Sequence, residues 1–142
     1  MTRFYAIDEA NAALPDLERI LGALRDQRVE LIDLRDQAIA VTPDDEPPTD
    51  EAAEALRLLR LRMQGLIDQM QAGVARLVDL DITLRDISTG LIDFPALLSG
   101  RPIWLCWRLG EQDVAHWHRH DEGFESRRPL AELPTGRSGR PA

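Results

Sequence analysis

The chain contains no lysine, one cysteine and few aromatic residues, and each shortage narrows what the protein can be. All 17 basic residues are arginine. Because the lone thiol, Cys106, has no partner within the chain, an internal disulfide is excluded. No apolar run approaches the length of a membrane-spanning helix. The first residues do not join a charged head to an apolar core, so we expect no secretory signal and a cytoplasmic protein.

The chain has fewer basic than acidic residues, and this balance limits the binding partners that we expect. The 17 basic residues face 25 acidic ones, for a net charge of -8. Nucleic acids and anionic membranes both attract clustered cationic side chains. We therefore expect neither as a partner.

The length of 142 residues, 44% of them hydrophobic, suits one domain with a core. We predict a single domain over 1–130. A Gly/Pro/Arg-rich tail over 131–142 is expected to be disordered.

A regular spacing of apolar residues predicts a first helix over 9–40. Asp8 suits its N-cap. Pro15 lies too deep for the first turn, which predicts a kink or a short preceding turn. An acidic, proline-rich linker over 41–49 follows. The apolar positions are Leu14, Leu17, Leu21, Leu24, Leu31 and Ala38.

A longer pattern predicts a second helix over 50–89. Thr49 or Asp50 can cap its start, and Gly90 can end it. The apolar spacing alternates between four and three residues throughout, which is typical of a coiled coil. These heptad positions are Ala52, Leu56, Leu59, Met63, Leu66, Met70, Gly73, Leu77, Leu80, Leu84 and Ile87.

The two helices are expected to form an antiparallel hairpin, which buries only one face of each helix. Self-association into a homodimer with a four-helix bundle would cover the rest. The alternative is a monomer whose third layer is a C-terminal sheet. Six apolar residues lie off the heptad positions and would stay exposed in a lone hairpin: Leu58, Leu61, Ile67, Val74, Val78 and Ile82.

Residues 91–124 predict a small antiparallel sheet of two or three strands. Residues 91–95 suit a short edge strand ended by its proline. Residues 102–109 alternate between two bulky faces, 110–113 suit a hairpin loop, and 114–118 suit the return strand. The predicted fold class is therefore mainly α with a small β element, an α+β protein.

The register of this hairpin decides which face carries the thiol. We favour pairing of Leu109 with Val114, which places Cys106 with Trp117 on the face opposite the histidines. A three-residue loop would shift the pairing by one and bring Cys106 to the histidine face. The sequence leaves both registers open.

All three histidines alternate in one short segment, as His116, His118 and His120. Alternate side chains of a strand share a face, and imidazole is the commonest protein ligand for metals. The outer pair would lie about 13 Å apart, so a metal binds two neighbours more easily than all three. Asp121 or Glu122 could complete a site for zinc or non-haem iron. A hydrogen-bonded cluster without metal and surface histidines without function are the alternatives.

The other candidate site residues have both structural and functional interpretations. Cys106 suits a small buried apolar residue better than a nucleophile. Trp107 and Trp117 suit core packing, or a tryptophan-lined pocket between sheet and helices for a small molecule. Arg127 and Arg128 could bind a phosphate or carboxylate, or pair with acidic surface residues.

Several motifs resemble the uncharacterised bacterial family DUF2203. The resemblance covers most of the chain and is most specific from Asp86 to Leu130. It implies helices followed by a small β element and no established activity. The motifs are Leu14-Pro15-x-Leu17, Leu84-Arg85-Asp86-Ile87-x-x-Gly90-Leu91-Ile92-Asp93-Phe94-Pro95, Leu105-Cys106-Trp107-Arg108-Leu109-Gly110-Glu111, and Trp117-His118 through Gly123-Phe124 to Arg127-Arg128-Pro129-Leu130.

The resemblance also ranks the histidines. Trp117-His118 is the position that fits the family pattern, whereas His116 and His120 fall outside it. The polar cluster it implies joins His118 with one or more acidic residues. These are Asp93, Glu111, Asp121 and Glu122.

The sequence contains no Ser/His/Asp motif, glycine-rich phosphate loop or Cys-x-x-Cys pair that would indicate a reaction. We expect a homo-oligomeric binding or assembly module that engages a protein partner. The alternatives are a metal-binding protein or metal-dependent enzyme at the histidine stripe, and a small-molecule binder.

Overall fold

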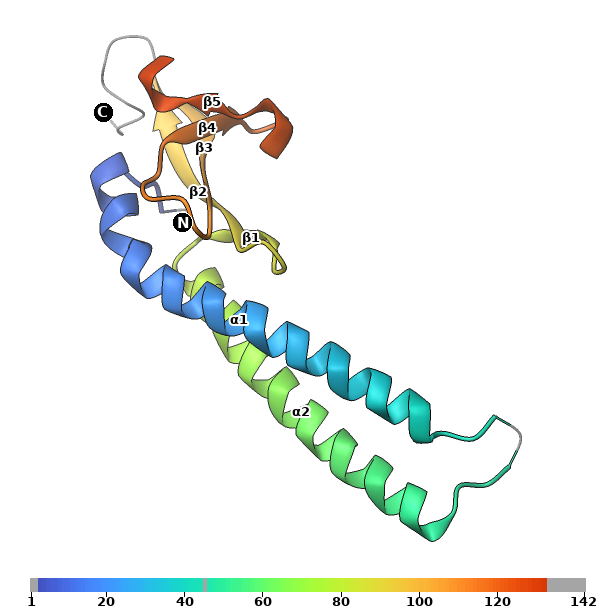
Figure 1. Cartoon of the computed structure of the whole chain (residues 1–142). Coiled ribbons are helices and arrows are strands. Elements are labelled where there is room, and N and C mark those ends of the chain that lie inside the picture. The colour runs from blue at the N-terminus through green and yellow to red at the C-terminus, as the bar shows by residue number, and fades with distance from the viewer. Residues whose placement is uncertain (1–2, 45, 133–142) are drawn as a thin grey trace.

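Two long helices form a hairpin, and a small sheet sits at one end of it in the computed structural model (Figure 1). The structure describes residues 3–44 and 46–132. The predicted α+β class is confirmed, but the sheet has five strands rather than two or three. The predicted four-helix bundle is not observed, because the described residues contain a single helical hairpin. None of their helices is long and apolar enough to cross a membrane.

The first helix, α1 (Ile7–Val41), agrees closely with the predicted 9–40. Its N-cap is Ala6 rather than Asp8, because the Glu9 carboxylate accepts a hydrogen bond from the Ala6 N–H at 3.0 Å. Pro15 lies inside the helix, whose first turns bend over the sheet (Figure 1). A bend is expected where proline removes a backbone hydrogen bond.

The second helix, α2 (Asp50–Asp79), is shorter than predicted. Thr49 caps it as expected, since its hydroxyl accepts a hydrogen bond from the Ala52 N–H at 3.1 Å. The prediction of helix up to residue 89 is wrong, because Asp81 adopts a left-handed φ of 58° and turns the chain away.

The heptad pattern predicted too long a helix because the apolar spacing continues past the end of α2 at Asp79. Leu84 lies in strand β1 (Thr83–Asp86) and Ile87 in the turn after it, and both still pack against the core. Gly90, predicted to end the helix, instead occupies that turn with φ 67°. The spacing of apolar residues indicates which of them are buried together. It does not show whether they belong to one continuous helix.

The sheet is antiparallel with the strands in chain order, β1-β2-β3-β4-β5. The strands after β1 are β2 (Leu91–Leu98), β3 (Arg101–Arg108), β4 (His116–Arg119) and β5 (Arg128–Pro129). Two 3-10 turns, η1 (Phe124–Ser126) and η2 (Leu130–Glu132), complete the described chain. The predicted disordered tail, 131–142, lies outside the described residues from 133 onward.

Strand β2 is neither an edge strand nor ended by Pro95, as the sequence had suggested. Pro95 lies within β2 opposite Trp104 of β3, and its carbonyl accepts a hydrogen bond from the Tyr5 N–H at 2.8 Å. A strand residue's nitrogen and carbonyl point to the same side. The missing N–H of Pro95 therefore faces the side where β1 no longer pairs, so no ladder hydrogen bond is lost.

One face of the sheet packs on α1 and forms the core. Leucines of α1 meet alternate residues of the three central strands, and Tyr5 donates its hydroxyl to the Leu80 carbonyl at 2.6 Å. Strand alternation sends the intervening residues to the other face. The core residues of the sheet are Ile92, Phe94, Ala96, Ile103, Leu105, Trp107 and Trp117.

The favoured register of the β3–β4 hairpin is wrong by one residue. Cys106 pairs with His116 and Leu105 pairs with Trp117, which is the alternative register. Val114, expected opposite Leu109, is instead buried outside the ladder, and its N–H donates to the Asn11 side chain at 2.8 Å. The observed pairing places Cys106 on the same face of the sheet as the histidines.

Candidate functional sites

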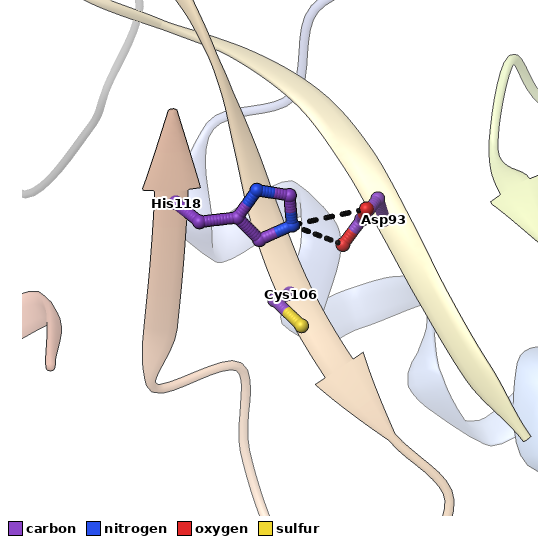
Figure 2. Close-up of side chains that lie close together, drawn as sticks. All are labelled: Asp93, Cys106 and His118. Atoms are coloured by element: carbon purple, nitrogen blue, oxygen red, sulfur yellow. Dashed lines mark hydrogen bonds and ion pairs between the residues drawn. The ribbon is translucent and has the colours of Figure 1, made fainter. Parts of the chain in front are cut away.

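Three polar side chains meet on the sheet face opposite α1. Asp93 comes from β2, Cys106 from β3 and His118 from β4 (Figure 2). Asp93 and Cys106 are paired directly, whereas His118 is paired with Trp104, one diagonal step away. All three residues are at most 2% exposed. Burying polar groups this completely is costly unless each has a partner.

Hydrogen bonds fix the orientation of His118. Its Nδ1 lies 2.9 Å from the Arg119 carbonyl, which can only accept, so we assign the proton to Nδ1. Its Nε2 then points at Asp93 and lies 3.1 Å from both carboxylate oxygens. Arg85 donates to one of these oxygens at 2.8 Å. The carboxylate is therefore held between a guanidinium and an imidazole.

The Cys106 thiol completes the group without being a nucleophile. Burial, together with the nearby Asp93 carboxylate, raises the pKa of the thiol to about 12, and a hydrogen bond from Arg127 offsets only part of this. Both ring nitrogens of His118 are already engaged, so the imidazole does not serve the sulfur as a base. This arrangement argues against cysteine-type nucleophilic catalysis.

A pocket of about 320 Å³ opens onto these three side chains. Asp93, Cys106 and His118 all line it, with Arg85 and the segment 120–124 around them. That segment joins β4 to η1 and contributes polar groups as well as Phe124. The pocket is at the small end of the range for ligand sites, which is about 300 to 1,000 Å³.

The three histidines do not converge on one point. His116 Nδ1 lies 3.9 Å from a Glu111 carboxylate oxygen, and His120 stacks on Trp104 with ring centroids 4.5 Å apart. Among the described residues, the one group of side chains placed to share a metal contains His118 but neither of the other two. His118 is the histidine that the family resemblance had singled out.

Two of the acidic candidate residues, Glu111 and Glu122, form ion pairs with arginines. Glu122 lines the pocket but pairs with Arg128 at 2.7 and 3.0 Å, and these hydrogen bonds lower its pKa to about 2. Burial raises the pKa of Glu111, but the hydrogen bonds from Arg127 and from the Arg108 N–H, together with the Arg127 charge, outweigh burial and the net pKa is lowered. Asp121 is exposed at the pocket rim.

The predicted tryptophans belong to the core rather than to a pocket. Trp107 is 0% exposed and Trp117 is 5% exposed, and both pack between the sheet and α1. Sequence reasoning missed Arg85 as a partner of Asp93. A signal was present, since Asp93 is the one charged residue in the strand Leu91–Leu98. A single acidic residue in an otherwise apolar strand is expected to be buried and to have a hydrogen-bond partner.

The helical hairpin carries a second kind of candidate site. Leu58, Leu61 and Val78 are 50%, 58% and 64% exposed, as the heptad analysis predicted. Ile67 and Val74 are half-buried, and Ile82 is fully buried, against expectation.

Two apolar grooves run along the hairpin. The groove nearer the sheet, here the proximal groove, has a volume of about 560 Å³. The groove nearer the interhelical loop, here the distal groove, has a volume of about 670 Å³. The proximal groove is lined by the apolar residues Leu31, Ile67, Met70, Val74, Ala75, Val78 and Ile87, with Gln71 and Asp79 beside them. The distal groove is lined by the apolar residues Ala40, Val41, Ala55, Leu58, Leu59 and Leu61, with Gln37 and Arg62 beside them.

Comparison with protein families shows which family the chain belongs to. The family model described as an uncharacterized conserved protein, DUF2203, matches residues 3–130. No curated protein and no solved structure matches the chain.

Proposed function

We propose that this chain, which belongs to the uncharacterised DUF2203 family, is a homodimeric assembly module. In this proposal the hairpins of two copies pair across the proximal groove and build a four-helix bundle. The supporting observation is the groove itself, an apolar surface that spans α1, α2 and the β1–β2 turn. Such surfaces on soluble proteins commonly mark interaction sites.

The proximal groove is the better of the two interfaces. Leu31 of α1 and Ile87 of the β1–β2 turn flank the α2 residues Val74 and Val78, so three elements form one surface. Each groove has one charged lining residue, Asp79 in the proximal groove and Arg62 in the distal groove, but the distal groove lies at the end of the hairpin that joins the loop. A two-fold axis near the proximal groove would place identical apolar residues against each other, as closed dimers require.

The size of the hairpin supports a second copy as the occupant. With 30 residues, α2 is about 45 Å long at about 1.5 Å per residue. Two helices side by side, about 10 Å apart, present a face of about 900 Å² per copy. A typical stable interface buries about 800 Å² on each partner. The whole face of the hairpin, of which the proximal groove is a part, is therefore large enough for an interface between two copies.

Two matched substitutions test the proposal. Val78 and Leu61 are both exposed apolar residues of α2, but they line different grooves. We expect the full chain to sediment as a dimer at micromolar concentration. Val78→Glu should weaken the dimer at least tenfold, because each copy would bury an unpaired charge. Leu61→Glu should leave the dimer intact.

Circular dichroism serves as the control that both variants keep their helices. A full chain that sediments as a monomer would contradict the proposal. So would a dimer that Leu61→Glu disrupts while Val78→Glu does not.

A further inference from the structure

We propose that Asp93, Cys106 and His118 form a binding site for a divalent transition metal, with zinc the best match to the donor set. The inference is independent of the assembly proposal. It also differs from the site expected from the histidine stripe, because only His118 is shared. Its basis is the meeting of a carboxylate, a thiol and an imidazole on three neighbouring strands (Figure 2).

The three donor atoms are close enough to bind one ion. One atom from each side chain lies within 4.8 Å of the other two. Zinc bonds of about 2.0 to 2.3 Å in a tetrahedron place neighbouring ligand atoms about 3.3 to 3.8 Å apart. The 3.1 Å contact between His118 and Asp93 therefore needs to open slightly when an ion binds.

The surrounding hydrogen bonds already orient two of the ligands. The Nδ1–H of His118 is held by the Arg119 carbonyl, which leaves Nε2 as the nitrogen that faces the site. Arg85 holds one oxygen of Asp93. Imidazole–carbonyl and carboxylate–donor contacts of this kind are the usual supports of metal ligands, since they fix the tautomer and the direction of the lone pair.

The charges of the group also suit a cation. When a divalent ion binds, the thiol loses its proton to become thiolate, and Nε2 of His118 presents its lone pair to the ion. One thiolate and one carboxylate then balance the two charges of the ion. Nitrogen, oxygen and sulfur together form a ligand set that zinc accepts.

A fourth position would remain for a small ligand. All three side chains line the 320 Å³ pocket, so an ion bound to them would face it. Glu122 also lines the pocket but is held by Arg128, and His120 is held against Trp104. Three protein ligands with one position open to solvent is the pattern of zinc sites that bind an exchangeable water or substrate.

The test uses the full chain, purified without a polyhistidine tag and stripped with a chelator. Zn²⁺ titration against a chromophoric chelator measures affinity, and Co²⁺ reports the ligands through its absorption spectrum. We expect one ion per chain, with a thiolate-to-cobalt charge-transfer band. Cys106→Ser should abolish that band and weaken Zn²⁺ binding at least tenfold. Asp93→Asn should also weaken Zn²⁺ binding at least tenfold.

His116→Ala is the matched control, because His116 lies on the same strand and face but outside the donor group. It should leave the affinity and the cobalt spectrum unchanged. Near-isosteric replacements are used for the ligands, and circular dichroism verifies that they fold. No stoichiometric binding at micromolar Zn²⁺ would overturn the proposal. Binding that Cys106→Ser leaves intact, or that His116→Ala abolishes, would overturn it too.

Discussion

The Nε2 atom of His118 lies 3.1 Å from both carboxylate oxygens of Asp93, although strand β3 separates the strands that carry them. The two side chains reach toward each other across the small side chain of Cys106 (Figure 2). The contact joins residues 25 positions apart in the chain. It therefore depends on the whole central sheet being assembled.

Asp93→Ala should destabilise the protein strongly. The change leaves Nε2 of the buried His118 without its partner, and a buried polar group that loses its hydrogen-bond partner costs about 1 to 3 kcal/mol. Urea unfolding of the metal-stripped chain measures the change. Asp68→Ala, at an exposed position of α2, is the control and should have little effect. Equal effects of the two substitutions would contradict the structural role of the pair.

Gly90→Ala should destabilise the turn between β1 and β2. Gly90 has φ 67°, and an added Cβ would lie 2.6 Å from the Leu109 Cβ. The left-handed conformation alone costs about 1 to 2 kcal/mol for a residue with a side chain, and the contact adds to it. Gly65→Ala is the matched control, because nothing lies within 4 Å of its added Cβ. It should instead stabilise α2, by about 1 kcal/mol in thermal or urea unfolding.

The carboxyl of Glu122 should titrate far below its ordinary range. Hydrogen bonds from Arg128 and from the Arg119 N–H hold its pKa at about 2, against an ordinary value of 4.5. Because the folded pKa is lowered, this contribution to stability is complete above about pH 4.5. It is lost as the pH falls toward 2.

NMR titration of the side-chain carboxyl measures the Glu122 midpoint directly. In Arg128→Gln the pKa should return toward 4.5. A midpoint near 4.5 in the unmodified protein would contradict the pairing.

The Cys106 thiol should resist alkylation in the folded, metal-stripped protein. Its pKa is raised to about 12 and it is 1% exposed, so few thiolates form at pH 8 and reagents reach them poorly. Mass spectrometry after iodoacetamide treatment should find the folded chain unmodified and the urea-unfolded chain fully modified. Rapid labelling of the folded chain would contradict the burial and would indicate an accessible thiol.

Most of the helical part of the fold could be predicted from the local spacing of apolar residues. The spacing of Leu14, Leu17, Leu21 and Leu24 predicted both α1 and the face that is buried. The start of α2 followed from Thr49, a residue whose cap geometry is local. Its end was not predictable in this way, because Leu84 and Ile87 continue the apolar spacing outside any helix.

Only part of the candidate site could be predicted from the sequence. The family resemblance pointed to His118 and to acidic neighbours including Asp93, and both belong to the buried group. The third member, Cys106, depended on a register that the sequence left open. In the observed register Val114 leaves the ladder, and its N–H donates to the Asn11 side chain of α1. No local rule connects residues 11 and 114.

The sequence by itself determined α1, the start of α2 and the presence of a strand hairpin after the helices, because periodicity and caps are properties of neighbouring residues. It also determined the α+β class. Only the tertiary structure decided which polar side chains share a site. That choice depends on strand register and on where the chain leaves α2, and both are set by contacts between segments far apart in the chain.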